Sequence, residues 1–144
     1  GYKNHINADK THKLIRRYHV TEASLHDSNA FDEVFDAKNT AKDIWADSAY
    51  RAREREEGLK ARGYRSHIHH KGTRGHPLSE AKQAANTRRS RVRARVEHVF
   101  GGQAAMGGKL MRGIGIVRAR AKIGMKNLVY NLQRFVFLAK PASA

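Results

Sequence analysis

The chain has 144 residues, of which 40% are hydrophobic, and it contains no cysteine. This length suits a single domain with one core. The lack of cysteine excludes a disulfide framework and any thiolate zinc site, and it fits a reducing cytosol. No stretch approaches the roughly 18 uncharged apolar residues of a membrane-spanning helix, and nothing at the beginning marks secretion.

Charge is distributed unevenly along the chain, whose formal net charge is +16. Residues 1–58 contain 10 Lys and Arg against 11 Asp and Glu, whereas residues 59–144 contain 19 against 2. Such a basic half favours a polyanionic partner, and arginine matches phosphate through its planar fork of donors. Nucleic acid is the favoured partner and anionic lipid the second, because the basic run lacks the broad apolar face of an interfacial helix.

Weak alternation of apolar and polar residues over 2–9 and 13–20 predicts a β-hairpin. The apolar spacing within 21–36 predicts a short amphipathic helix. The segment "DIWADSAY", residues 43–50, then predicts a short strand with Asp47 near its middle. A charged helix over 51–63 is expected to end at Gly63, since glycine is favoured just after a helix.

The second half begins with a predicted strand over 64–70 and a loop over 71–77 that is rich in glycine and proline. A helix is predicted from 78 to about 100, and the six glycines of 101–115 predict a loop or broken linker. A last helix is expected over 117–138. Its apolar stripe is interpreted as core, and its members are Val117, Ala121, Met125, Leu128, Leu132 and Phe135.

The predicted order is therefore β-β-α-β-α-β-α-α, which indicates a mixed α/β fold. We expect one domain over residues 1–144, with a strand-rich part at 1–77 and a basic helical part at 78–144.

Two acids stand out from this pattern. Asp47 lies in a predicted strand, where a carboxylate is disfavoured unless it is paired or binds metal. Glu97 follows a run of arginines, and apart from Glu80 it is the only acid beyond residue 58. Each alone has a structural explanation, because Asp47 could cap the next helix and Glu97 could pair with Arg93 at i,i+4 spacing. Together they could be two ligands of a divalent-ion site for phosphoryl transfer, since carboxylates suit Mg²⁺ or Mn²⁺.

Three blocks also resemble a known family: "GYKNHINADKTHKLIRRYHVTEASLHDS", "ADSAYR" and "RVRARVEHVFG". They are similar, in this order, to the C-terminal part of bacterial insertion-sequence DDE transposases, in the group named after insertion sequence five. The resemblance implies an RNase H-like mixed sheet flanked by helices, with Asp47 as the second catalytic acid and Glu97 as the third. Both would bind Mg²⁺ or Mn²⁺.

The resemblance also implies where this chain departs from the family. The first acid belongs to a first strand that would precede residue 1, so that strand is expected to be missing here, with Asp9 as a substitute to be tested. Arg93 matches the arginine four residues before the glutamate. Ser90 and Ala104 stand where the family pattern has a tyrosine and a lysine, so those two DNA contacts are not carried over.

These observations favour a fragment of a DNA transposase, inactive alone, whose parent cuts and joins DNA at mobile-element ends in the cytoplasm, associated with the nucleoid. We expect homo-oligomers on DNA. A non-catalytic basic nucleic-acid-binding module and a structured RNA-binding protein remain alternatives. A His67–His69 zinc site is less favoured, because a third ligand at recognisable spacing is lacking. The expected phosphate contacts are Arg88, Arg89, Arg91, Arg93 and Arg95.

Overall fold

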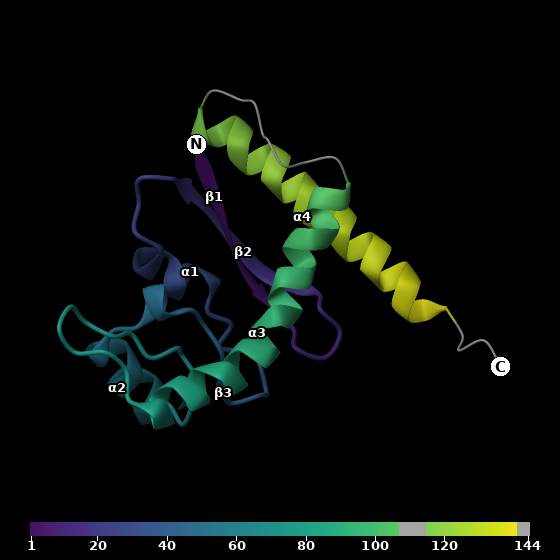
Figure 1. The fold of residues 1–144 in the computed structure, drawn as a ribbon. Coiled ribbons are helices and arrows are strands. Elements are labelled where there is room, and N and C mark those ends of the chain that lie inside the picture. Colours follow the sequence, from purple (N-terminus) through teal and green to yellow (C-terminus); the bar gives the residue numbers. More distant parts are fainter. Residues whose placement is uncertain (107–114, 141–144) are drawn as a thin grey trace.

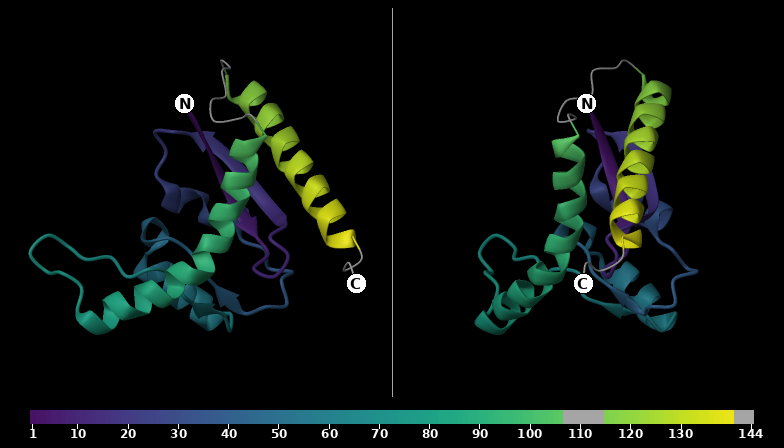
Figure 2. Two further views of the ribbon diagram at one scale, coloured as in Figure 1. Left: turned by 45° about the vertical axis from the view of Figure 1, so that its right-hand side comes forward. Right: turned by 90° about the vertical axis from the view of Figure 1, so that its right-hand side faces the viewer.

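The computed structural model describes residues 1–106 and 115–140. The order of elements is the predicted one, with two short 3₁₀ turns added before α1 and α2. The long helix α3, Glu80–Ala105, runs from the part of the molecule that holds β3 and α2 towards α4, Ile116–Ala139 (Figures 1 and 2). The mixed α/β class is therefore confirmed, with small sheets and four α-helices among the described residues.

The predicted hairpin is confirmed as strands β1, Tyr2–Ala8, and β2, Ile15–Glu22, which pair antiparallel. Its register shifts between Asn7 and Ala8, so that Ala8 faces Ile15. The Asp9 carboxylate accepts hydrogen bonds from the backbone N–H groups of Thr11 and His12, at 3.1 and 2.8 Å. Asp9 thus organises the hairpin turn, as aspartate commonly does.

The second sheet is a parallel pair of very short strands, β3, Asp43–Ile44, and β4, Arg65–Ser66. The strands predicted over 43–50 and 64–70 are therefore too long. Backbone hydrogen bonds continue the pairing beyond β4, from His67 N to the Ile44 carbonyl at 2.7 Å and from His69 N to the Ala46 carbonyl at 3.1 Å. After that the chain turns into the 3₁₀ segment Ser48–Tyr50, so Asp47 lies just before a turn and not in mid-strand.

Helix α2, Arg53–Ala61, connects β3 to β4 and ends as predicted at a glycine. Gly63 has φ of 75°, and its N–H bonds to the Lys60 carbonyl while that of Tyr64 bonds to the Leu59 carbonyl. These two bonds form a Schellman motif, in which a left-handed residue closes the helix.

The core beside this sheet is shared with helix α1, Phe31–Val34. The helix predicted over 21–36 is thus reduced to the 3₁₀ turn Asp27–Ala30 followed by α1, because β2 extends to Glu22. The buried cluster consists of Phe31, Phe35, Leu59, Tyr64 and Ile68.

Helix α3 continues beyond its predicted end near residue 100. Gly101 and Gly102 belong to the helix, and only residues 107–114 of the predicted loop lie outside the described residues. A Cβ on Gly102 would lie 3.0 Å from Cε2 of Tyr130, so glycine here lets α4 pack closely against the backbone of α3. Gly102 therefore serves close helix packing, and this packing outweighs the low helix propensity of glycine.

The core face predicted for α4 is wrong. Val117, Met125 and Phe135 are 76%, 69% and 63% exposed, and the rest of the predicted large apolar stripe is exposed as well. The opposite face is the buried one, with Ala119, Ile123, Asn127 and Tyr130.

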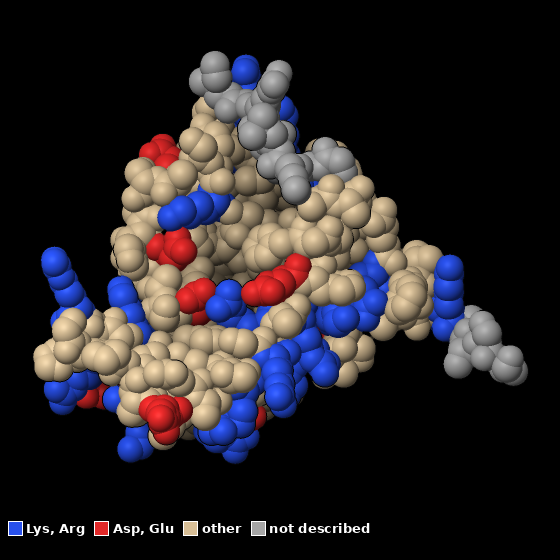
Figure 3. Space-filling model, viewed as in Figure 1, with Lys and Arg blue, Asp and Glu red and all other residues tan. Residues whose placement is uncertain are grey.

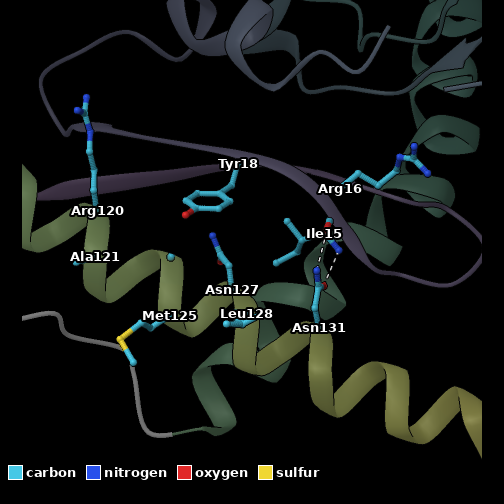
Figure 4. A pocket seen from close by; sticks show the side chains of 10 residues that line it. Ile15, Arg16, Tyr18, Arg120, Ala121, Met125, Asn127, Leu128 and Asn131 are labelled. Atoms are coloured by element: carbon cyan, nitrogen blue, oxygen red, sulfur yellow. Dashed lines mark hydrogen bonds between the residues drawn. The ribbon is translucent and has the colours of Figure 1, made fainter. Parts of the chain in front are cut away.

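Polar side chains explain which face of α4 is buried. Asn131 hydrogen-bonds both the N–H and the carbonyl of Ile15, each at 2.8 Å, and this pair is drawn in Figure 4. Asn127 joins Gln103 of α3 to Asn4 of β1 through its amide group, at 2.7 and 2.8 Å. These bonds satisfy buried amides, whereas turning the helix to bury the apolar stripe would leave them unpaired.

A groove of about 480 Å³ remains between β2 and α4, and Figure 4 shows its lining, from Tyr18 on the strand to Met125 and Leu128 on the helix. The groove and the exposed stripe together give α4 an outer face rich in apolar side chains. Exposed apolar surfaces of this kind commonly mark protein–protein contacts. Within the described residues, none of the helices has the length and apolar character needed to cross a membrane.

Candidate functional site

The candidate site lies where the turn after β3 meets α3. Asp47 occupies the position before the Ser48–Tyr50 turn, with extended backbone at φ −69° and ψ 159°. The Ser48 hydroxyl donates to Oδ1 of Asp47 at 3.0 Å. Asp47 makes no capping bond to the turn through its side chain, so the capping role that sequence reasoning left open is absent at this residue.

Arg93 brings the two acids together. Its Nη1 lies 2.9 Å from Oδ2 of Asp47, and its Nη2 lies 3.4 Å from Oε1 of Glu97. The side chains of Asp47 and Glu97 are 42% and 65% exposed, so both carboxylates are open to solvent. Two residues fifty positions apart in sequence thus bind one guanidinium, and the expected i,i+4 pair of Arg93 and Glu97 is also present.

One face of the molecule is hollowed. Figure 3 shows acidic and basic side chains side by side at the lower edge of a hollow, with further Lys and Arg side chains over α3. Basic side chains gathered along α3 would attract a polyanion.

The pKa of Asp47 is lower than that of an ordinary aspartate. Partial burial is the largest single influence and opposes ionisation, but the Arg93 charge, the Ser48 hydroxyl and the nearby backbone N–H groups of Ser48 and Ala49 together outweigh it. Asp47 is therefore ionised at neutral pH, as a metal ligand or an ion-pair partner must be.

The residues at this site provide some, but not all, of the ligands that a divalent-cation site needs. Asp47 and Glu97 provide hard carboxylate oxygens, which suit Mg²⁺ and Mn²⁺. In residues 1–106 and 115–140, however, no group of three or more acidic, histidine or cysteine side chains could hold a metal ion. Asp9 is occupied at the hairpin turn, where His12 also contacts its carboxylate at 2.7 Å. The described residues therefore do not complete a two-ion site by themselves.

A buried polar chain that sequence reasoning missed fixes the turn after Asp47. The Tyr50 hydroxyl hydrogen-bonds Nδ1 of His5 on β1 at 2.9 Å, and Nε2 of His5 bonds Oγ1 of Thr21 on β2 at 2.9 Å. Burial raises the pKa of Tyr50 to about 12 and, as the largest influence, lowers that of His5. Tyr50 thus ties the Asp47 turn to the hairpin. The alternating pattern placed His5 in a strand but could not identify its partner.

The five arginines of the basic run have different environments. Arg89 donates to the Ile68 carbonyl at 2.8 Å, Arg93 holds the two acids, and Arg95 donates to the Lys10 carbonyl at 3.1 Å. Arg88 and Arg91 are exposed. The sequence alone could not separate arginines that support the structure from those that remain available to phosphate.

His67 and His69, the weaker zinc-site candidates, hydrogen-bond different residues. His67 bonds Oδ1 of Asp43 at 2.9 Å, whereas His69 bonds the hydroxyl of Ser90 on α3 at 3.0 Å. Ser90 thus connects α3 to the segment after β4.

Comparison with known proteins identifies the family. The family model described as "Transposase DDE domain" matches residues 1–132, which is most of the chain. The chain therefore belongs to the DDE transposase domain family. Searches of curated proteins and of solved structures gave no match.

Proposed function

We propose that this chain is part of a bacterial insertion-sequence transposase of the group named after insertion sequence five, and that Asp47 and Glu97 are two of its three catalytic acids. The observation that carries the proposal is their convergence on Arg93, at 2.9 and 3.4 Å, within a family whose name denotes three acids. Residues 1–144 would be a single partial catalytic domain of that enzyme.

In the intact protein these carboxylates would hold Mg²⁺ or Mn²⁺, which supplies charge neutralisation and an activated oxygen nucleophile for phosphoryl transfer. The residues present here have narrower tasks. Arg93 holds both acids close together, Tyr50 holds the Asp47 turn, and the arginines of α3 bind the DNA backbone. Arginine is suited to that task, since it can bind phosphate through two parallel hydrogen bonds.

An RNase H-like sheet would place another strand between β1 and β3. Support comes from the sheet topology, because β1 pairs only with β2 and β3 only with β4 among the described residues. Each of these two strands therefore has one edge without a strand partner in this part of the chain. We propose that a strand carrying the first acid joins both pairs in the parent protein.

The same proposal covers assembly and location. The apolar outer face of α4 supports homo-oligomer formation on DNA, because large exposed apolar patches commonly mark protein contacts. The protein would act on chromosomal DNA, in the cytoplasm and in association with the nucleoid.

A second function has a specific observation in its favour. Arg93 already neutralises Asp47 and Glu97, so the three groups form a satisfied ion-pair network without metal. A non-catalytic DNA-binding module would need nothing more from them.

DNA cleavage separates the two functions. We expect the 144-residue chain to leave transposon-end DNA uncut with Mg²⁺ or Mn²⁺, and a version extended with the upstream sequence of its gene to cut it. In the extended protein, Asp47→Asn or Glu97→Gln should abolish cutting while DNA binding is retained. Glu80→Gln is the matched control, since it removes an acid from the start of the same helix. Full cleavage by the Asp47 and Glu97 variants would refute the catalytic assignment.

A further inference from the structure

We propose that Trp45 and His67 form a stacking site for one unpaired nucleobase of DNA, with the exposed Arg88 binding the adjoining phosphate and Arg89 forming part of the wall. The proposal rests on the proposed DNA-processing function and adds a contact that is separate from the two acids. It concerns a pocket of about 210 Å³ that lies between the β3–β4 pair and α3.

The two rings form a parallel pair that the local backbone creates. Trp45 follows β3 and His67 follows β4, and the bond from His67 N to the Ile44 carbonyl, at 2.7 Å, aligns the two segments. The ring centroids are 4.8 Å apart and the planes differ by 14°. The half-buried Trp45 ring, stacked on an imidazole, offers a flat aromatic surface that suits another planar ring.

Hydrogen bonds to Asp43 fix the orientation of the His67 ring. Nε2 of His67 bonds Oδ1 of Asp43 at 2.9 Å, and Arg65 donates to both Asp43 oxygens at 2.7 Å each. Those bonds hold the pKa of Asp43 far below its ordinary value, so the carboxylate stays charged and keeps its partners. The imidazole orientation is thus fixed before any ligand binds, which lowers the cost of ordering it.

Helix α3 provides the other wall of the pocket. The lining there consists of the small Ala85 and the two arginines Arg88 and Arg89. Arg89 is fixed by its bond to the Ile68 carbonyl, whereas Arg88 is exposed. Aromatic rings beside arginines are the combination by which proteins bind single-stranded nucleic acid, because rings stack on bases and guanidinium groups hold phosphates.

A cation already occupies part of this aromatic surface. Nζ of Lys10 lies 4.5 Å from the centroid of the Trp45 ring. Lys10 is an exposed hairpin residue, so a base can displace its ammonium group at little cost, and the displaced lysine then lies near the DNA backbone.

The base must be unpaired, because a base inside a duplex is already stacked on its neighbours and paired. The position is appropriate for processing a DNA end. Arg89 and Arg93 are separated by one turn of α3, a rise of about 6 Å. That rise corresponds to about two nucleotides at roughly 3.4 Å each along a strand. A base in this pocket would therefore hold the strand in register with the phosphate at Asp47 and Glu97.

Trp45 is the only tryptophan of the chain, so its fluorescence reports on this site alone. The 144-residue chain would be titrated with oligothymidylate and with an abasic oligonucleotide of equal length and charge. Binding of each would be measured separately by anisotropy of a label on the DNA. We expect both oligonucleotides to bind, but only oligothymidylate to quench Trp45.

Variants provide a second readout. Trp45→Ala should weaken oligothymidylate binding by about 5- to 150-fold, the range found for loss of one stacked base, and should leave abasic binding unchanged. Trp45→Phe, which keeps an aromatic ring, should retain most of the affinity. Equal quenching by both oligonucleotides, or none with either while both bind, would show a plain anion-binding surface and overturn the stacking site. If neither oligonucleotide bound at all, the DNA-binding part of the proposed function would fail as well.

Discussion

Arg88 and Arg91 provide the sharpest test of the DNA interface. Both are exposed on α3, and neither takes part in the ion pairs of the basic run, which belong to Arg93 in the described part of the chain. Arg89 and Arg95, by contrast, are bound to backbone carbonyls. Replacing Arg88 and Arg91 with alanine should therefore remove phosphate contacts and leave the fold intact.

The expected magnitude follows from counterion release. Each phosphate that the protein no longer neutralises changes the slope of log K against log salt by about 0.9. Loss of both arginines should flatten the slope by about 1.8. Between about 50 and about 200 mM salt, the wild-type chain should then lose about 12-fold more affinity than the double variant.

The assay is anisotropy of a labelled duplex over a series of salt concentrations. A double replacement of Lys60 and Arg74 by alanine is the matched control, because it removes the same charge from exposed positions outside α3. An unchanged slope in the Arg88 and Arg91 variant would refute the assignment. Equal flattening in both variants would show that net charge alone, and not the α3 face, determines binding.

Two further predictions concern stability. Gly102→Ala should destabilise the fold by about 1 kcal/mol despite better helix propensity, because the new Cβ meets the buried Tyr130 ring, whose hydroxyl is held by the Lys13 carbonyl. Gly124→Ala should be neutral or stabilising in the same denaturant titrations, since the half-exposed Tyr18 hydroxyl can move away; an equal loss in both would contradict the reasoning. The Tyr50 pKa, raised from 10.0 to about 12, means that the neutral phenol is favoured in the folded state. Its contribution to stability should be complete below pH 10 and be lost as the pH rises towards about 12, a loss that Tyr50→Phe should abolish in alkaline unfolding curves.

The order of elements was predictable because it depends on local signals. Alternation predicted the hairpin, and the glycine at position 63 predicted the end of α2, where its left-handed backbone closes the helix. The lengths were less predictable. β3 and β4 are only two residues each, and the chain leaves their pairing at the 3₁₀ turn that follows Asp47.

The face by which α4 packs could not be predicted from its apolar period. The helix has apolar side chains on two faces, and periodicity does not rank them. Asn127 and Asn131 decide the outcome, since their amides find partners on the hairpin and on α3. Those partners are more than a hundred positions away on the hairpin, so no local pattern contains the information.

The candidate site shows the same division between local and distant information. The Arg93–Glu97 pair follows from helical spacing, whereas the contact of Arg93 with Asp47 depends on how α3 crosses the turn after β3. With Arg93 at this position, the two carboxylates are held next to one guanidinium. A divalent ion that bound Asp47 and Glu97 would have to compete with a guanidinium that is already neutralising them. If Asp47 and Glu97 bind metal as proposed, Arg93 would both assemble the pair and limit its affinity for the ion, and DNA phosphates that draw this arginine away would release the carboxylates when substrate is present.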